Sequence, residues 1–337
     1  MQSYRLQSFG SIEHLQRVEE DIPEPGRNQL LIKVRACSLN YRDLALLYGT
    51  GTLSPQAGLI PLSDGSGEVV MAGAAVTRFS VGDRVAGSFF PYWTAGDLTE
   101  AAGRAAYGTQ SDGWLTQYKV VDEASLVKFP AYLSFAQAAT LPCAAVTAWN
   151  SLMKSRQLRA GETVLTQGTG GVALFAVQLA KIMGLMVISL TSNAEKARLL
   201  TSLGADHIVN YLDHPDWFRQ VREITDGEGV QRIVEVGGPA TLENSLRACA
   251  AGGEIALLGF VAQGAQPIDF FTLFKSGATI RPFSVGSRQD FEQMNRALSF
   301  SRLQPVISHV FDFDDALEAW RYFDRRLHTG KVVIAVN

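Results

Sequence analysis

A glycine-rich loop between two apolar segments is the feature that most constrains the fold of this 337-residue chain. The run Val164–Gln167 leads into Gly168–Ala173, which has the spacing G-x-G-x-x-A, and an apolar, helix-like stretch follows. In such a turn the first glycine permits a tight reversal, the second lets a pyrophosphate approach the backbone, and the small sixth residue lets the helix pack on the sheet. The alternative is that these small residues serve only strand–helix packing. The context favours a dinucleotide-binding loop with contacts at Gly168, Thr169, Gly170, Gly171 and Val172.

That context is a regular alternation of short apolar runs and helical stretches. Val172–Met183, for example, is typical of a buried helix that joins two such runs. Strand–helix–strand alternation requires crossover connections, and these produce a parallel sheet. Six strands predict a doubly wound α/β domain over residues 129–285. The predicted strands are Thr163–Thr166, Met186–Leu190, His207–Val209, Arg232–Val236, Glu254–Leu258 and Thr279–Phe283.

The two ends of the chain have a different pattern. Leu30–Ala36 alternates with the period of a half-buried strand, and further short strands are expected up to residue 128. The tail combines helical stretches at Gln289–Phe300 and Asp314–Leu327 with a final strand at Lys331–Val336. We therefore expect one β-rich domain, formed by residues 1–128 and 286–337, that is split by insertion of the nucleotide domain.

Composition narrows the class of protein. A formal net charge of −3 provides no field that would gather nucleic acid or an anionic membrane, so neither partner is expected. Cys37, Cys143 and Cys249 are few and widely spaced, which argues against a disulfide framework and fits a reducing compartment. No signal-peptide pattern and no run of about 18 apolar residues is present, so we expect a cytoplasmic protein.

The end of the second predicted strand indicates which dinucleotide is bound. Proteins that select NAD usually place an acid there, about 20 residues after the glycines, to bind the ribose hydroxyls. Here the strand ends at Ser192 and Asn193, which can donate hydrogen bonds, and Lys196 follows. A 2′-phosphate needs donors and positive charge. The missing acid therefore predicts NADPH, and it carries more weight than Lys196, because a single lysine is more typical of a solvated helix residue.

With these motifs in order, the chain resembles the medium-chain dehydrogenase/reductase superfamily over nearly its whole length. The resemblance implies a GroES-like β-rich catalytic domain with an inserted Rossmann domain, and a small-molecule substrate bound between them. It also implies a homodimer paired through the last strand of the nucleotide sheet. The motifs are Pro25–Gly26, Leu30–Val34, Leu39–Asp43, Gly65–Val70, Val81–Val85, Ala144–Trp149, Gly168–Val172, Gly204–His207, Val236–Gly238 and Gly330–Val333.

One branch of that superfamily holds catalytic zinc with cysteine and histidine ligands, and its ligand positions fall here on Asn40, Ser63 and Cys143. An amide, a hydroxyl and one thiol do not make a credible zinc site. The four-cysteine structural-zinc loop is also absent, because residues 91–113 contain no cysteine. Asp64 stands where the zinc branch has a carboxylate beside its ligands. We therefore expect no metal.

Without zinc, the chain resembles the quinone-oxidoreductase branch, which keeps an asparagine at the position of Asn40 and binds NADPH. That resemblance maps the adenosine-phosphate contacts onto Lys196 and Tyr211, and it maps a threonine near the nicotinamide onto Thr147. Two residues that end predicted strands, Val236 and Leu258, complete the expected cofactor contacts.

These expectations define an enzyme that transfers hydride from NADPH to a quinone or an α,β-unsaturated carbonyl compound. Such acceptors are already electrophilic and need little Lewis-acid help. Asn40 would donate to the acceptor or position the nicotinamide, and Asp64 is a catalytic candidate whose simpler role is a structural hydrogen bond. The alternatives are a zinc-type alcohol dehydrogenase-like enzyme and a non-catalytic NADPH-binding protein.

The proton donor and the substrate pocket are less constrained. The tyrosines that relatives use fall on Ala45 and Gly51, so the candidates are Tyr48 and water. Several aromatic residues could form an apolar pocket, and they could equally belong to the core or to a dimer interface. These residues are Phe89, Phe90, Tyr92, Trp93, Phe260, Phe270 and Phe271.

Overall fold

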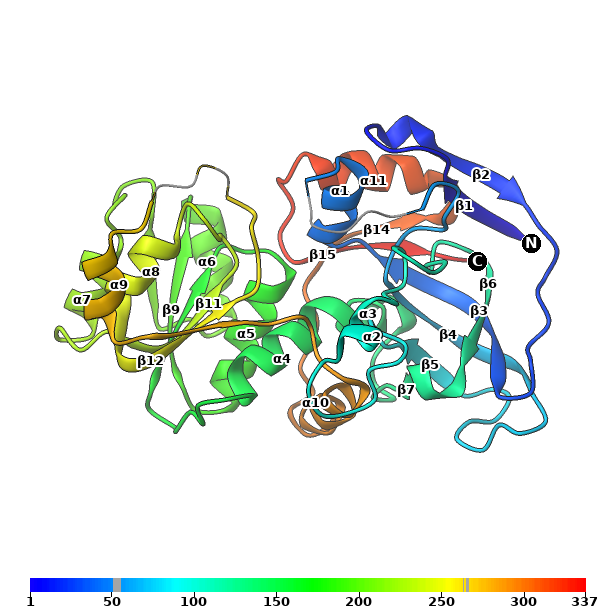
Figure 1. Ribbon diagram of the computed structural model, residues 1–337, viewed down its shortest axis with the longest axis horizontal. Helices are drawn as coiled ribbons and strands as arrows, with labels where there is room; N and C mark the ends of the chain where they lie inside the picture. The colour runs from blue at the N-terminus through cyan, green and yellow to red at the C-terminus, as the bar shows by residue number, and fades with distance from the viewer. Residues whose placement is uncertain (51–55, 263, 265–266) are drawn as a thin grey trace. The chain divides into compact units, whose positions relative to one another are not determined.

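The computed structural model describes residues 1–50, 56–262, 264 and 267–337 (Figure 1). The chain divides into two compact units. Unit 1 consists of Met1–Val146 and Val285–Asn337, and unit 2 consists of Thr147–Ser284. The nucleotide-type unit is thus inserted into the other unit.

Unit 2 contains a sheet of six described strands in the order β10-β9-β8-β11-β12-β13, and every neighbouring pair is parallel. The chain moves outward from β8 through β9 to β10 and then restarts at β11 on the other side of β8. The predicted parallel sheet is therefore confirmed, and β8 and β11 meet at the point where the strand order reverses. The strands are β8 (Thr163–Gln167), β9 (Met186–Thr191), β10 (His207–Asn210), β11 (Val230–Glu235), β12 (Cys249–Leu257) and β13 (Thr279–Pro282).

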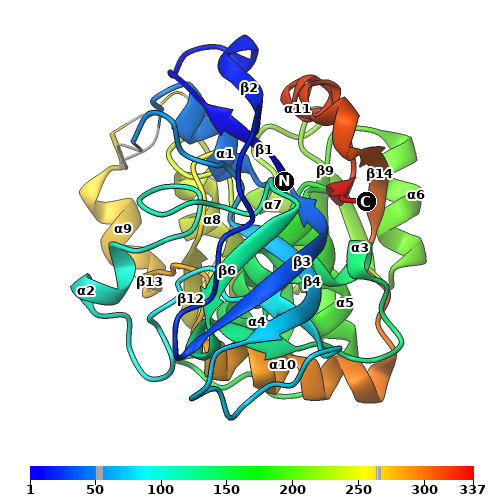
Figure 2. The ribbon, with the colours of Figure 1, turned by 90° about the vertical axis from the view of Figure 1, so that its right-hand side faces the viewer.

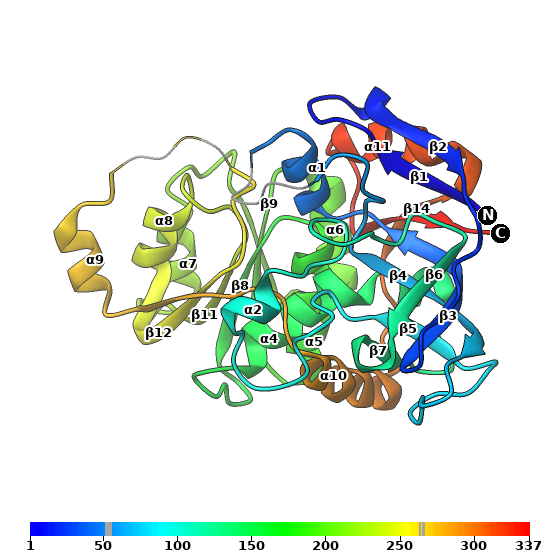
Figure 3. The ribbon, with the colours of Figure 1, turned by 45° about the vertical axis from the view of Figure 1, so that its right-hand side comes forward.

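Helices cover this sheet because its central strands are apolar. All five residues of β8 are buried, and Leu165, Ile188 and Ile233 from three adjacent strands share one core cluster. Two helices, α7 and α8, lie side by side (Figures 1 and 3) and α8 also contacts α9. The helices are α4 (Val146–Met153, whose first residue belongs to unit 1), α5 (Gly171–Ile182), α6 (Ala194–Ser202), α7 (Phe218–Ile224), α8 (Leu242–Ala248) and α9 (Phe270–Ser276).

Unit 1 contains a larger sheet in the order β14-β15-β3-β4-β5-β7, with β6 paired to β3, and a separate β1-β2 hairpin. β3, β4 and β6 lie side by side (Figure 2). The tail returns to this unit as predicted, because β15 pairs antiparallel with β3. The strands are β1 (Gln2–Leu6), β2 (Leu15–Glu19), β3 (Gln29–Ser38), β4 (Asp64–Ala72), β5 (Arg84–Gly87), β6 (Tyr118–Asp122), β7 (Leu126–Lys128), β14 (Ile307–Asp312) and β15 (Lys331–Ala335).

The helices of unit 1 are short except near its C-terminal end. A π-helical turn, Leu141–Ala145, follows α3, and single 3-10 turns occur at Ile12–His14, Glu123–Ser125 and Phe313–Asp315. No helix in the described residues is long and apolar enough to cross a lipid bilayer. The helices are α1 (Tyr41–Leu47), α2 (Glu100–Gly103), α3 (Phe135–Ala138), α10 (Arg288–Ser301) and α11 (Ala316–Asp324).

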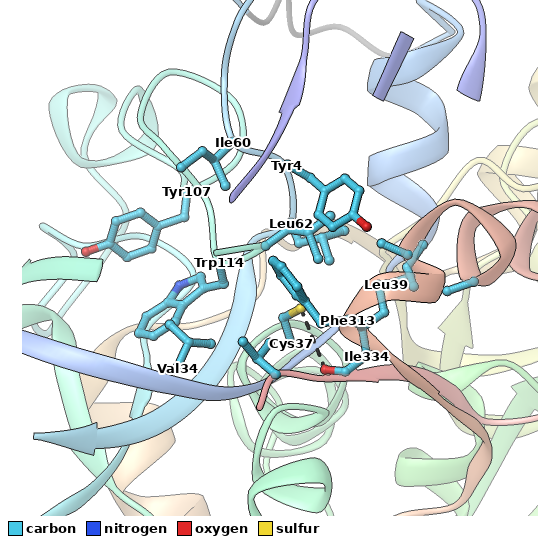
Figure 4. Close-up of a cluster of buried hydrophobic side chains, with 14 of the residues drawn as sticks. Tyr4, Val34, Cys37, Leu39, Ile60, Leu62, Tyr107, Trp114, Phe313 and Ile334 are labelled. Carbon is cyan, nitrogen blue, oxygen red and sulfur yellow. Dashed lines mark hydrogen bonds between the residues drawn. The ribbon is translucent and has the colours of Figure 1, made fainter. Parts of the chain in front are cut away.

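The core of unit 1 is packed around Trp114, which is fully buried (Figure 4). A Cβ on Gly65 would lie 2.3 Å from the Trp114 ring, and one on Gly87 would lie 2.2 Å from it. The indole therefore requires glycine on both β4 and β5. Cys37 lies in the same cluster, and its Sγ is 3.8 Å from the carbonyl oxygen of Ile334. It is a packed apolar residue.

The first boundary between the units differs from the expected one, since unit 1 continues to Val146 instead of ending at residue 128. The reason is that α3 and the residue after it pack on the sheet of unit 1: Ala139 shares a core cluster with Ala36 and Val333 of the sheet. In addition, the hydroxyl of Ser38 donates to the carbonyl of Ala139 over 3.0 Å.

Candidate active site

The glycine loop of unit 2 has the geometry of a phosphate cradle. Gly168 has φ +75°, a conformation that favours glycine, and its N–H donates to the carbonyl of Leu190 over 2.8 Å. Gly170 is the N-cap of the twelve-residue helix α5 and has no side chain that could bond to the first helix amides. Apart from the adjacent residues of the chain, no described residue has an atom within 4 Å of a Cβ built on Gly168 or Gly170. A helix N-terminus beside such open space fits a pyrophosphate group.

A buried polar pair lies directly beneath this loop. Gln167, the last residue of β8, donates through Nε2 to a carboxylate oxygen of Glu235 over 2.6 Å. Its Oε1 accepts the N–H groups of Val236 and Gly237 over 3.1 and 3.0 Å. The two strand ends at the reversal point are thus joined through side chains. Neither Gln167 nor Glu235 was identified from the sequence, where polar residues ending two buried strands were the available signal.

The carboxylate of Glu235 is fully buried and well supplied with donors. Beyond Gln167, it accepts the N–H of Gly238 over 2.8 Å and the hydroxyl of Thr241 over 2.6 Å. The hydroxyl of Ser245 donates to its other oxygen. Four donors on one buried carboxylate compensate for its desolvation, so the turn after β11 is held rigidly.

The residues predicted to hold a 2′-phosphate gather where β9 and β10 end. Asn193 caps α6, and its Oδ1 accepts the N–H of Lys196 over 2.8 Å, so the remaining polar group of that side chain is its amide donor. Tyr211 donates its backbone N–H to the carbonyl of Thr191 over 3.0 Å, which brings it to the same edge. Ser192 and Lys196 are partly exposed and Tyr211 is 39% exposed. These groups offer donors and one positive charge to solvent.

The remaining residues that were predicted to contact the cofactor lie on different elements of the fold. Thr147 is buried on α4. Val236 follows β11, and Leu258 donates its N–H to the carbonyl of Glu235 over 2.9 Å. Leu258 also lines an apolar cavity of about 600 Å³ with Gly238, Leu242, Phe260 and others. Asn40 belongs to unit 1.

In unit 1, Asn40 stands at the start of α1 within a buried polar cluster. Its backbone N–H donates to Asp43 Oδ2 over 2.8 Å, which fixes the first turn of the helix. Arg42 Nη1 lies 3.1 Å from the other oxygen of Asp43. Burial raises the pKa of Asp43 to about 6, and the guanidinium of Arg42 opposes that shift.

The side chain of Asn40 connects two further groups. Lys331 Nζ donates to Asn40 Oδ1 and, over 2.6 Å, to the carbonyl of Leu39. On the other side, Asn40 Nδ2 lies 3.5 Å from Ser63 Oγ. Lys331 was not identified as a site residue from the sequence, because a lysine at the start of an apolar strand is typical of an exposed strand end.

Asp64 joins this cluster by accepting two hydrogen bonds. It accepts the hydroxyl of Ser63 over 2.7 Å and the backbone N–H of Cys143 over 3.0 Å, one on each carboxylate oxygen. Asp64 is fully buried. The structure therefore brings Asn40, Ser63, Asp64, Cys143 and Lys331 together in one connected group.

This donor set does not fit a zinc ion. Asn40 offers a neutral amide that is bonded to an ammonium group, and Ser63 offers a hydroxyl. Burial raises the pKa of the Cys143 thiol and favours its protonated form, whereas zinc needs a thiolate. Within the described part of the chain, no three or more His, Cys, Asp or Glu residues are arranged to hold a metal ion.

Tyr48, the candidate proton donor, lies at the end of α1 and is 40% exposed. Its hydroxyl donates to Asp324 Oδ2 over 2.9 Å, so the hydrogen bonds described for it lead to α11 and not to Asn40. Partial burial and the bond to Asp324 raise the pKa of Tyr48. Ala45 is buried within α1, and Gly51 lies outside the described residues.

The aromatic residues considered for a pocket separate into two groups. Phe89, Phe90 and Trp93 are buried, and the ring of Phe90 contacts the other two edge to face, as core residues do. The other four candidates are exposed, and these are Tyr92, Phe260, Phe270 and Phe271.

Comparison with known protein families gives two matches. Residues 26–131 match the alcohol dehydrogenase GroES-like domain, and residues 171–299 match the zinc-binding dehydrogenase family. Among curated proteins, the chain is 38% identical to a zinc-type alcohol dehydrogenase-like protein of Schizosaccharomyces pombe, over 98% of this chain and 97% of that protein. It is 32% identical to a quinone oxidoreductase of Pseudomonas aeruginosa, over 87% of this chain and 84% of that protein.

Solved structures give the same picture. A putative alcohol dehydrogenase from Sinorhizobium meliloti superposes with a TM-score of 0.92 at 36% identity, covering 99% of this chain and 98% of that one. A mycobacterial protein solved in complex with NADPH superposes with a TM-score of 0.83 at 27% identity, covering 99% and 100% of the two chains. The predicted fold, a GroES-like β domain with a Rossmann domain, is confirmed.

Proposed function

We propose a function from one premise: this chain belongs to the medium-chain dehydrogenase/reductase superfamily and is an oxidoreductase of it. Within that superfamily, the proposal is an NADPH-dependent reductase that has no catalytic zinc. Its acceptor is a quinone or an α,β-unsaturated carbonyl compound.

The observation that carries this proposal is the bonding of Asn40. Its carbonyl oxygen accepts from an ammonium group, and its amide nitrogen lies toward Ser63. A site built this way offers a hydrogen-bond donor to a carbonyl oxygen and offers no thiolate or imidazole to a metal. Acceptors that are electrophilic without a metal suit such a site.

The names of two of the most similar proteins favour the alternative, a zinc-type alcohol dehydrogenase-like enzyme. Against it stand the residues themselves, since Asn40, Ser63 and Cys143 occupy the three positions where that branch needs zinc ligands. The donor set counts for more than a relative's name, because a zinc ion is bound by the ligand atoms themselves.

The residues of unit 2 fit NADPH, which supplies the hydride when it is bound. The amides of the loop from Gly168 to Val172 would hold its pyrophosphate. Its 2′-phosphate would lie against Ser192, Asn193, Lys196 and Tyr211. We assign Thr147, Val236 and Leu258 to the nicotinamide half.

The residues of unit 1 would act on the acceptor. As hydride reaches the acceptor carbon, negative charge grows on the carbonyl oxygen, and the Nδ2–H of Asn40 stabilises it by donating a hydrogen bond. Asp64 holds Ser63 and Cys143 in place around Asn40. A proton then completes the reduction, from Tyr48 or from water. Unchanged turnover in Tyr48→Phe would leave water as the donor.

The proposed enzyme is a homodimer. β13 ends the sheet of unit 2, and the adjacent helix α9 exposes Phe270, Phe271 and Phe274 at 67%, 61% and 73%. An edge strand beside an apolar surface suits pairing with a second copy. Phe274→Asp should lower the mass measured by light scattering, whereas Phe300→Asp, at a 92% exposed residue of α10, should not.

The test of the function is a metal analysis joined to a turnover screen. Purified protein should contain no stoichiometric zinc, and it should oxidise NADPH faster than NADH with quinones or enones. Stoichiometric zinc together with alcohol oxidation would support the alternative enzyme. Tight NADPH binding without turnover of quinones, enones, aldehydes or alcohols would indicate a non-catalytic binding protein.

A further inference from the structure

We propose that Lys331 is a positioning residue that makes Asn40 an obligatory and strengthened hydrogen-bond donor. Its ammonium group holds the carbonyl end of the Asn40 amide, so that the N–H end is directed to the reacting oxygen. This inference rests on the proposed function for its catalytic meaning, although the bond itself can be measured without any substrate.

The bond is built into the sheet of unit 1. Lys331 is the first residue of β15 and is 2% exposed. The N–H of Leu39 donates to the carbonyl of Val332 over 3.1 Å, so β15 and the chain just after β3 are in register at this point. Lys331 Nζ therefore reaches the carbonyl of Leu39 and the side chain of Asn40 from a fixed backbone.

An ammonium group decides which way an asparagine amide faces. Lysine offers three donors and no acceptor, so only the carbonyl oxygen of Asn40 can face Lys331 favourably. The nitrogen of the amide must then face the other side, where Ser63 Oγ lies at the long distance of 3.5 Å. One amide hydrogen is directed along that line, and the second remains for another acceptor.

The charge of Lys331 also changes the strength of the donor. A hydrogen bond from an ammonium group to Oδ1 draws electron density out of the amide and makes its N–H more positive, and such chains of bonds reinforce one another in a low-dielectric interior. Both Lys331 and Asn40 are buried, at 2% and 7% exposure. Bulk water therefore does not screen the effect.

Two carboxylates offset part of the cost of burying the Lys331 ammonium group. Burial lowers the pKa of Lys331, and the nearby carboxylates of Asp64 and Asp43 oppose that shift and favour the charged form. A simpler role for the same lysine would be to satisfy the carbonyl of Leu39. The two roles differ in what happens to the Asn40 amide when Lys331 is removed.

The first test observes that amide directly. The side-chain ¹H–¹⁵N resonances of Asn40, assigned by their loss in Asn40→Ala, are recorded in the wild-type protein, Lys331→Met and Lys331→Arg. Removal of the ammonium group should shift both resonances and speed their exchange with water. The arginine variant, which still donates, should restore most of the wild-type position.

The second test measures turnover with NADPH on a series of ring-substituted quinones. Lys331→Met should lower kcat by about 10-fold or more, but by less than the roughly 100- to 1000-fold that loss of a whole oxyanion donor costs. The loss should grow as the quinone becomes more electron-rich, because such acceptors depend more on the donor. Lys331→Met combined with Asn40→Ala should be no slower than Asn40→Ala alone.

The matched control is Lys119, another buried lysine of unit 1, which donates to the carbonyl of Asp112. Lys119→Met should lower the melting temperature yet leave the Asn40 resonances and the quinone series unchanged. Unchanged Asn40 resonances in Lys331→Met, or losses that multiply in the double variant, would overturn the inference. If no acceptor is turned over but the resonances respond as expected, the positioning role stands and the proposed function fails.

Discussion

Gln167 and Glu235 lie 2.6 Å apart at the ends of two adjacent parallel strands, and the bond between them joins the glycine loop after β8 to the turn after β11. The same Gln167 side chain accepts two backbone N–H groups of that turn. One residue thus fixes two segments that the proposed cofactor would contact.

Gln167→Ala should therefore impair both stability and cofactor binding. It removes a donor from a buried carboxylate and the acceptor of Val236 and Gly237, and each unsatisfied buried group costs about 1–3 kcal/mol. We expect the free energy of unfolding to fall by roughly 2–4 kcal/mol in urea titrations and the Kd for NADPH to rise about tenfold.

Gln231 provides the control, because it lies on the same sheet near the start of β11, at the other end of the strands from Gln167. Its Oε1 accepts the N–H of Thr163 over 2.8 Å, so it also joins β8 and β11 but far from the glycine loop. Gln231→Ala should lower the free energy of unfolding by about 1 kcal/mol and leave the Kd for NADPH unchanged. Equal effects of the two variants on NADPH would contradict the role given to Gln167.

Gly170→Ala should separate cofactor binding from folding. Gly170 has an ordinary φ of −74°, and a Cβ there meets no described atom within 4 Å. The free energy of unfolding should change by less than about 1 kcal/mol, because the substitution fits the fold and stiffens the unfolded chain. The Kd for NADPH, measured by fluorescence titration, should rise about tenfold or more because the methyl group fills the space of the pyrophosphate.

Gly65→Ala in unit 1 should have the opposite effect, a loss of stability without a loss of cofactor binding. Its new Cβ would lie 2.3 Å from the buried Trp114 ring, so the ring or the strand must move. Overpacking of this kind lowers the free energy of unfolding by roughly 1–3 kcal/mol. The Kd for NADPH of the folded protein should stay at its wild-type value. A large loss of stability in Gly170→Ala, or none in Gly65→Ala, would show that these contacts are wrongly assigned.

The fold could be predicted from the sequence because most of its helices and strands are marked by patterns among residues that are close together in the chain. Apolar runs at strand spacing, separated by helical stretches, are sufficient to predict the sheet of unit 2, and Gly168 and Gly170 mark its first turn. The boundary between the units was harder to predict. It depends on α3 packing against Ala36 and Val333, residues that are distant in the chain.

The candidate site was predicted only in part for the same physical reason. Asn40 and Asp64 were proposed through a resemblance, which named Ser63 and Cys143 only as positions that do not make a zinc site, and hydrogen bonds connect all four. Lys331 was missed, because its bond to Asn40 spans 291 positions and depends on β15 lying beside β3. A residue of that kind becomes visible only when the strand order is known.

The pair formed by Glu162 and Arg156 predicts how the stability of unit 2 depends on pH. Arg156 donates to both carboxylate oxygens over 2.9 and 2.6 Å, and these bonds, opposed by partial desolvation, lower the pKa of Glu162 to about 2. A folded-state pKa below the unfolded value means that the stabilisation is complete above the unfolded pKa and is lost as the pH falls toward 2.

Glu162→Gln should therefore be less stable than the wild type by about 1 kcal/mol near neutral pH, the size of a well-formed exposed ion pair. The difference should shrink steadily in urea titrations between about pH 5 and about pH 3. A difference that stayed constant over this range would show that the carboxylate acts through packing and not through its charge.

The preference for NADPH gives the sharpest test of the adenosine end of the site. Lys196 is a cation near the end of β9, and Ser192 occupies the region where an acid would select NAD. Lys196→Ala should raise the KM for NADPH about tenfold, the loss expected for one charge-assisted bond to phosphate, and leave the KM for NADH unchanged. Ser192→Asp should go further and reverse the preference, since a carboxylate repels the 2′-phosphate and accepts the ribose hydroxyls.

Arg198→Ala, at an exposed residue of the same helix, serves as the control and should keep the wild-type ratio of kcat/KM for the two cofactors. Two results would mean that the missing acid does not select the cofactor. One is a wild-type enzyme with equal kcat/KM for NADH and NADPH, and the other is a Lys196→Ala variant in which the ratio of these two values is unchanged.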